Sequence, residues 1–165
     1  MPKLAGLGNA LFRNVLGGWQ LSGIFRAQTG GAFSVTQRSP GGPASRPDLV
    51  DPKNAILPDY RETLRYLNRA AFATVSLSPL RIPIRPGSAG HNAFRGPGAW
   101  VVDCSFGKNF RITEQIRFQL RADMFNALNH TNLGGPVTDI DDPFFGMIFG
   151  TGGARSIQLN ARLSF

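Results

Sequence analysis

The chain has 165 residues and a formal net charge of +8, with hydrophobic residues at 42% and charged residues at only 17%. Glycine (20), proline (12) and phenylalanine (13) are abundant, a mix that is rich in turn and strand formers and favours an all-β chain with long loops. No apolar run approaches the roughly 18–20 residues of a membrane-spanning helix, so helical spanning is excluded.

The basic and reactive residues point to no specific chemistry. Arginines are spread from Arg13 to Arg162 without a basic run, so nucleic acid is not expected as a partner. The single cysteine, Cys104, cannot form an intrachain disulfide and cannot build a metal site alone. The first eight residues contain no sustained apolar segment, so no signal peptide is expected in this chain.

Residues 1–17 are predicted to be a connector, and residues 18–29 the first strand. Apolar and polar side chains alternate from Trp19 to Gln28, and only Ile24 breaks the pattern. Residues 30–99 are predicted to be a long outer loop, rich in proline, with a short extended piece at 33–36 and one local helix around Asp59–Asn68.

Three further strands follow, at 100–110, 116–128 and 156–165. A short connector, 111–115, joins the first two, and a second long outer loop, 129–155, precedes the last. In the strand at 100–110 the apolar set is interrupted only by Lys108. Strands joined alternately by short turns and long loops are typical of antiparallel membrane barrels.

The last strand alternates without a break and ends the sequence on an aromatic residue. We predict that its apolar set faces lipid: Ile157, Leu159, Ala161, Leu163 and Phe165. We predict that the charged residues of the opposite faces line the lumen: Arg26, Asp103, Arg121, Asp123 and Arg162. Arg121 or Arg162 is expected to pair across strands with Asp103 or Asp123.

The predicted fold class is therefore all-β, an antiparallel meander of about four long strands with long loops, forming the C-terminal segment of a transmembrane β-barrel. Four strands cannot close a barrel, since the smallest use about eight. In lipid, the unpaired edges at 18–29 and 156–165 would each cost several kcal/mol per backbone group. We therefore expect 18–165 to be the end of a longer chain.

Several short sequence phrases resemble one known family. They are Gly18–Phe25 with Gln28-Thr29-Gly30, Asn92–Gly98, Lys108–Glu114 and Phe118–His130, the last ending in an F-N-x-x-N phrase. Together they resemble the barrel of TonB-dependent outer-membrane receptors, most closely the Oar-like subgroup with a carboxypeptidase-regulatory-like domain. The resemblance implies an outer-membrane location, as part of a longer chain, and substrate uptake without catalysis.

The resemblance also implies partners. These are outer-membrane lipid, the barrel-assembly machinery through the C-terminal strand and, only in a full-length parent, a plug domain and TonB. The alternative interpretation is a soluble β-sandwich module that binds through its long loops and buries Trp19 and Trp100 in a core.

No catalytic set, cofactor site or metal site is expected. His91 and His130 lie in predicted loops and are expected to be solvent-exposed. Cys104 alternates with Val102 and Phe106, so it is expected to act as a small hydrophobic residue. The acidic stretch Asp139–Asp142 is expected to be a solvated loop, with a calcium-binding loop as the less favoured alternative because the EF-hand spacing is missing.

Overall fold

The computed structural model describes residues 16–165, so nearly all of the predicted connector 1–17 lies outside the described residues. The chain divides into two compact units. The sheet unit comprises the described residues up to Ala27 together with Trp100–His130 and Gly153–Phe165, and the loop unit comprises Gln28–Ala99 and Thr131–Gly152. Each unit is described separately below.

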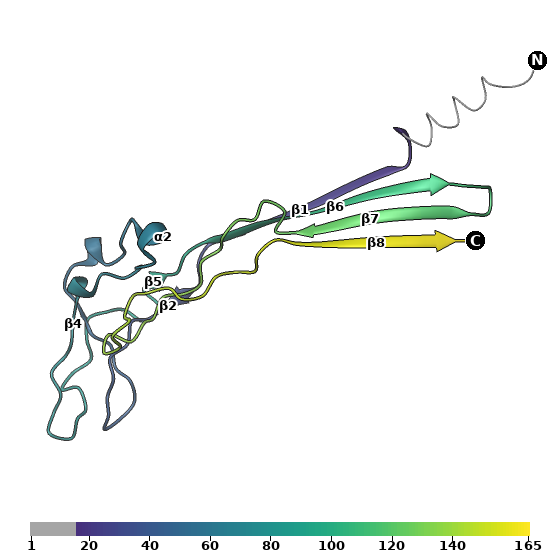
Figure 1. Ribbon diagram of the computed structural model, residues 1–165. Coiled ribbons are helices and arrows are strands. Elements are labelled where there is room, and N and C mark those ends of the chain that lie inside the picture. The colour runs from purple at the N-terminus through teal and green to yellow at the C-terminus, as the bar shows by residue number, and fades with distance from the viewer. Residues whose placement is uncertain (1–15) are drawn as a thin grey trace, which may run out of the picture. The chain divides into compact units, whose positions relative to one another are not determined.

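The sheet unit is built on one four-stranded antiparallel sheet (Figure 1). Its strands are β1 (Trp19–Gln28), β6 (Ala99–Arg111), β7 (Arg117–Phe125) and β8 (Ser156–Ser164). They are hydrogen-bonded in the order β1-β6-β7-β8. The prediction of an antiparallel arrangement of four long strands is confirmed.

The strand β7 ends earlier than its sequence pattern predicted. The expected strand ran to residue 128, but β7 stops at Phe125. The next residue, Asn126, has a φ of 49°, and Asn129 has a φ of 50°. Asparagine tolerates this left-handed conformation better than other residues with a side chain, and the conformation cannot continue a strand.

The strand register places apolar side chains in rows across one face. Leu120 in β7 lies opposite Lys108 of β6 and Ala161 of β8, and Ala122 lies opposite Phe106 and Leu159. Because successive side chains point to opposite faces, the residues between them carry the polar face. That face holds Asn109, Gln119, Arg121, Asp123, Gln158, Asn160 and Arg162.

The two long stretches between the strands of the sheet form the loop unit, and they contain short elements that the sequence did not predict. The unit contains two short antiparallel ladders, β2 (Ala32–Phe33) with β5 (Phe94–Arg95), and β3 (Asp48–Leu49) with β4 (Phe72–Ala73). Three short helices complete it: η1 (Pro52–Asn54), α2 (Tyr60–Thr63) and η2 (Arg69–Ala71).

Both predicted loops contribute to one apolar core in this unit. The buried cluster consists of Val35, Ala55, Tyr66, Leu67, Ala71, Phe72, Phe94, Ile140, Phe145 and Ile148. The first seven belong to the stretch between β1 and β6, and the last three to the stretch between β7 and β8. The two stretches are thus held together by the burial of apolar surface, the main favourable term in folding.

The helix predicted around Asp59–Asn68 is only partly present. The helix α2 covers Tyr60–Thr63 and ends at Leu64, whose φ of 57° is left-handed. Beyond that point Tyr66 and Leu67 are drawn into the core, at 5% and 3% exposure. Within the described residues, no helix is long and apolar enough to cross a membrane.

Candidate functional surfaces of the sheet and the loop unit

One face of the sheet carries large apolar side chains that the described residues leave uncovered. Leu159 is 78% exposed, Leu21 72% and Phe25 67%. A soluble β-sandwich would bury such a face against a second sheet, and soluble proteins rarely expose a contiguous apolar patch of this kind. Trp19 is also 62% exposed, so the expectation that a sandwich core would bury it is wrong.

The residues predicted to face lipid lie on this apolar face. In β8, Ile157, Leu159, Ala161 and Leu163 lie opposite Met124, Ala122, Leu120 and Phe118 of β7, respectively. Phe165 follows β8 and is 97% exposed. Their lipid contact itself stays a prediction.

Lys108 is the one charged residue in the apolar rows of β6, and it is only 6% exposed. Its Nζ lies 4.6 Å from the centroid of the Trp19 ring and 5.4 Å from that of Phe110. It also donates a hydrogen bond to the carbonyl oxygen of Gly17. The ammonium group is therefore surrounded by aromatic faces and a backbone acceptor, an arrangement in which cation–π attraction offsets desolvation.

Among the described residues the polar face holds two ion pairs, and one of them joins two residues that were predicted to pair. Arg26 of β1 donates to Asp103 of β6 at 2.7 Å. Arg121 donates to Asp123 at 2.8 Å, along one strand and not across two. Arg162 lies opposite Gln119, and among the described residues it makes no ion pair with either aspartate, so of the two predicted arginines only Arg121 pairs.

The F-N-x-x-N phrase forms a hydrogen-bonded lock between the end of β7 and the start of β8. Asn126, which is 6% exposed, donates from Nδ2 to the carbonyl oxygens of His130 (3.0 Å) and Gly153 (3.1 Å). Its Oδ1 accepts from the backbone N–H of His130 at 2.9 Å. Asn129 Oδ1 accepts from the N–H of Arg155 at 3.1 Å. The sequence phrase carried a family resemblance, but the sequence did not predict that its asparagines join the end of β7 to the start of β8.

The two histidines occupy different environments. His91 is exposed, as predicted. His130 is half-buried and stacks on Trp100, with ring centroids 3.9 Å apart and an interplanar angle of 20°. The expectation of a solvent-exposed His130 is wrong because the Asn126 lock fixes its backbone beside β6.

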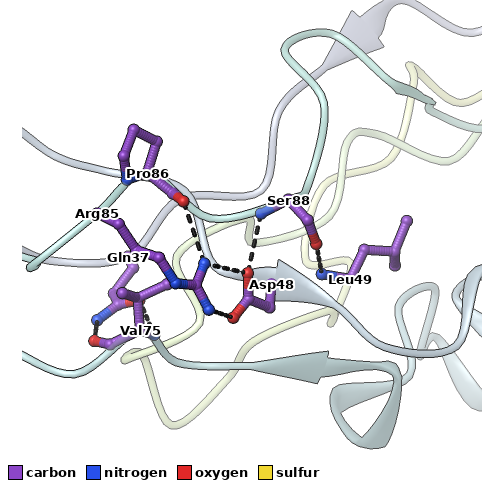
Figure 2. A network of polar contacts seen from close by, with 7 residues as sticks. All are labelled: Gln37, Asp48, Leu49, Val75, Arg85, Pro86 and Ser88. Atoms are coloured by element: carbon purple, nitrogen blue, oxygen red, sulfur yellow. Dashed lines mark hydrogen bonds and ion pairs between the residues drawn. The ribbon is translucent and has the colours of Figure 1, made fainter.

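In the loop unit, Asp48 of β3 is hydrogen-bonded to the stretch 85–88 (Figure 2). Its carboxylate accepts two hydrogen bonds from Arg85, at 2.6 and 2.8 Å, and one from the backbone N–H of Ser88 at 3.0 Å. The side-chain hydrogen bond from Arg85 is the main reason that the pKa of Asp48 is lowered, to about 2. The Ser88 hydroxyl in turn accepts from the N–H of Leu49, which fixes the edge of β3.

The acidic stretch of the second loop is engaged by Arg38. The Arg38 guanidinium lies 2.6 Å from Asp139 and 3.8 Å from Asp142, and its backbone N–H donates to Asp141 at 2.7 Å. The hydrogen bond to Asp139 raises the pKa of Arg38. The stretch thus joins the two loops, and its side chains stay in contact with solvent.

Across residues 16–165, no cluster of three or more histidine, cysteine, aspartate or glutamate side chains is placed to hold a metal ion. Cys104 is a free, half-buried thiol within β6.

Comparison with known proteins agrees with the geometry of the sheet. The family model described as an outer membrane beta barrel domain matches residues 1–158. No curated protein and no solved structure matches the chain. Since the family match covers nearly the whole sequence, and the structure is a β-sheet with one apolar and one polar face, this chain belongs to the outer membrane beta barrel domain family.

Proposed function

We propose that the chain forms the C-terminal part of the barrel of a TonB-dependent outer-membrane receptor that takes up a substrate. Membership of an outer-membrane barrel family supports the location, and the sequence phrases that resemble the Oar-like subgroup support the receptor type. The single observation that carries the proposal is the uncovered apolar face of the sheet, because such a face is stable against lipid and costly in water.

The two edge strands of the sheet need further strands as hydrogen-bonding partners. Within the described residues, β1 and β8 are each paired on one side only. In lipid, every backbone group must be hydrogen-bonded internally, so both edges must meet further strands. The barrel-assembly machinery would insert the sheet through β8, and a full-length parent would supply the remaining strands, a plug domain and the contact with TonB.

The arginines on the polar face favour an acidic partner inside the barrel. Arg111 and Arg117 lie directly opposite one another across β6 and β7. In the described residues neither they nor Arg162 has a carboxylate partner. Like charges placed directly opposite each other are destabilising, so acidic groups of a plug domain would stabilise this end of the sheet.

The test measures where the protein lies in the cell and whether it binds TonB. Native cells are fractionated and probed with an antibody to residues 155–165, and the detergent-extracted protein is passed over the immobilised periplasmic domain of TonB. We expect a heat-modifiable band in the outer-membrane fraction, far above 17.9 kDa, that the TonB column retains. An outer-membrane protein that TonB does not retain would refute the receptor assignment. A soluble band near 17.9 kDa would refute the barrel itself.

A further inference from the structure

The loop unit contains a cleft of about 320 Å³. The unit is rich in charged residues, among them Arg38, Arg85 and Asp48. Yet of the described residues none with a charged side chain lines the cleft. Its polar side chains are Gln28 and Thr138, and most of the remaining wall is glycine, proline and apolar side chains. The lining therefore suits an uncharged ligand that hydrogen-bonds to backbone groups.

The cleft lies where two chain segments diverge. Thr36 and Asp139 form a parallel β-bridge, in which the N–H of Thr36 donates to the carbonyl of Thr138 at 2.9 Å and the N–H of Ile140 donates to that of Thr36 at 2.8 Å. Followed back along the chain, residues 30–33 and 133–136 form parts of the cleft wall. Among the described residues, no backbone hydrogen bond joins these two stretches.

Each diverging segment is paired with a further stretch of the loop unit. The strand β2 pairs with β5 through Ala32–Arg95 and Phe33–Phe94. The second segment pairs with a following stretch through bridges between Leu133 and Thr151 and between Pro136 and Ile148. Two supported segments that lack a ladder between them offer backbone groups to an inserted extended chain.

Four of the five glycines that line the cleft fall into two groups. Packing requires glycine at position 30, since a Cβ would lie 1.8 Å from the carbonyl oxygen of Gly96, and a Cβ at Gly134 would make a tight contact of 3.0 Å with that of Gly150. A Cβ at Gly31 or Gly135 would meet no atom within 4 Å. Packing therefore does not require glycine at these two positions, and a side chain there would be added at residues that line the cleft.

We propose that this cleft binds an extended, uncharged peptide segment, which adds a strand between residues 30–33 and 133–136. A strand occupies about 160 Å³ per residue, from a spacing of about 4.8 Å between strands, about 10 Å between sheets and about 3.4 Å per residue. The cleft therefore takes about two residues. The inference rests on the proposed function, for which it names an uncharged peptide as the substrate class.

The experiment measures binding of the probe acetyl-Thr-Val-amide to the barrel that contains this chain, in detergent micelles, by isothermal titration and ligand-observed NMR. Gly31→Val and Gly135→Val place a side chain toward the cleft, and both should weaken binding at least tenfold. Gly150→Val is the matched control, because a Cβ there also meets nothing within 4 Å and the residue does not line the cleft. It should bind like the unmodified chain.

A second experiment compares two probes on the unmodified protein. The same probe with N-methylvaline has lost a main-chain donor, and it should bind at least tenfold more weakly. Equal binding of both probes, or equal binding by all three valine variants, would overturn the proposal. Maltotriose binding that is lost in Gly31→Val and Gly135→Val would overturn the peptide assignment in favour of a saccharide. Retention by TonB is scored separately, so failure of the receptor assignment and failure of the cleft are distinguishable.

Discussion

Leu159 offers the sharpest test of the sheet's two faces, because its neighbour Gln158 is a matched control on the other face. The strand β8 has nine residues from Ser156 to Ser164, and Leu159 is the fourth. At about 3.3 Å per residue, it lies roughly 3 Å from the middle of the strand. It is 78% exposed, and it lies opposite Ala122 of β7, so no neighbouring side chain shields it.

An arginine on the lipid face near the midplane of a barrel costs about 2–4 kcal/mol. We therefore expect Leu159→Arg to lower the free energy of unfolding by that amount, which reduces the folded-to-unfolded ratio roughly 30- to 700-fold. Gln158→Arg should change the free energy of unfolding by less than about 0.5 kcal/mol, since its side chain lies on the polar face opposite Asp123.

The assay is equilibrium unfolding by urea of the barrel that contains this chain, reconstituted in phosphatidylcholine liposomes. Tryptophan fluorescence reports on Trp19 and Trp100, and heat-modifiable migration on gels reports on the barrel. If Leu159→Arg were near-neutral while Gln158→Arg were costly, the lipid and lumen faces would be exchanged. If both were near-neutral, the sheet would not cross a bilayer at all.

Three further substitutions, two of them with a matched control, test the Asn126 hydrogen bonds and the loop unit. Asn126→Ala removes three side-chain hydrogen bonds of a buried residue and should cost about 2–3 kcal/mol in urea unfolding, whereas Asn129→Ala, which removes one, should cost about 1 kcal/mol. Ile140→Ala should destabilise the loop unit by about 2–5 kcal/mol, measured as faster proteolysis, and exposed Ile84→Ala should have little effect. The pKa of Asp48 is lowered from 3.8 to about 2, so its stabilising contribution is present above pH 3.8 and is lost as the pH falls toward 2; Asp48→Asn should abolish that part of the acid-induced loss of proteolytic resistance.

The strands and their faces could be predicted from the sequence because a period of two is a local signal. The alternation in β8 and β7 needs no knowledge of the rest of the fold, and the short turn after Arg111 fixes the register between β6 and β7. The Arg26–Asp103 pair was missed because its partners are 77 residues apart and joined through the whole first loop. No local pattern sets the register between β1 and β6.

The core and the short ladders of the loop unit were not predicted, for a related reason. Its core joins Val35 to Ile140 across more than half of the chain, and its apolar residues follow neither a helical nor a strand period. Short ladders of two residues, such as β2 with β5, give too few alternating positions to be recognised. The proline-rich composition that predicted an irregular loop is compatible with a compact unit, since prolines fix turns between short buried segments.

The two faces of the sheet and its edges impose different requirements, and only one kind of assembly meets all of them. The exposed apolar face, with Leu21, Phe25 and Leu159, is stable against lipid but not in water. The charged face, with Arg121, Asp123 and Arg162, is stable in water but not in lipid. An open sheet in a bilayer would expose the charged face, or the edges of β1 and β8, to hydrocarbon. Closure with further strands encloses the charged face in a wet lumen and pairs both edges, so a closed barrel is the assembly in which this sheet is stable.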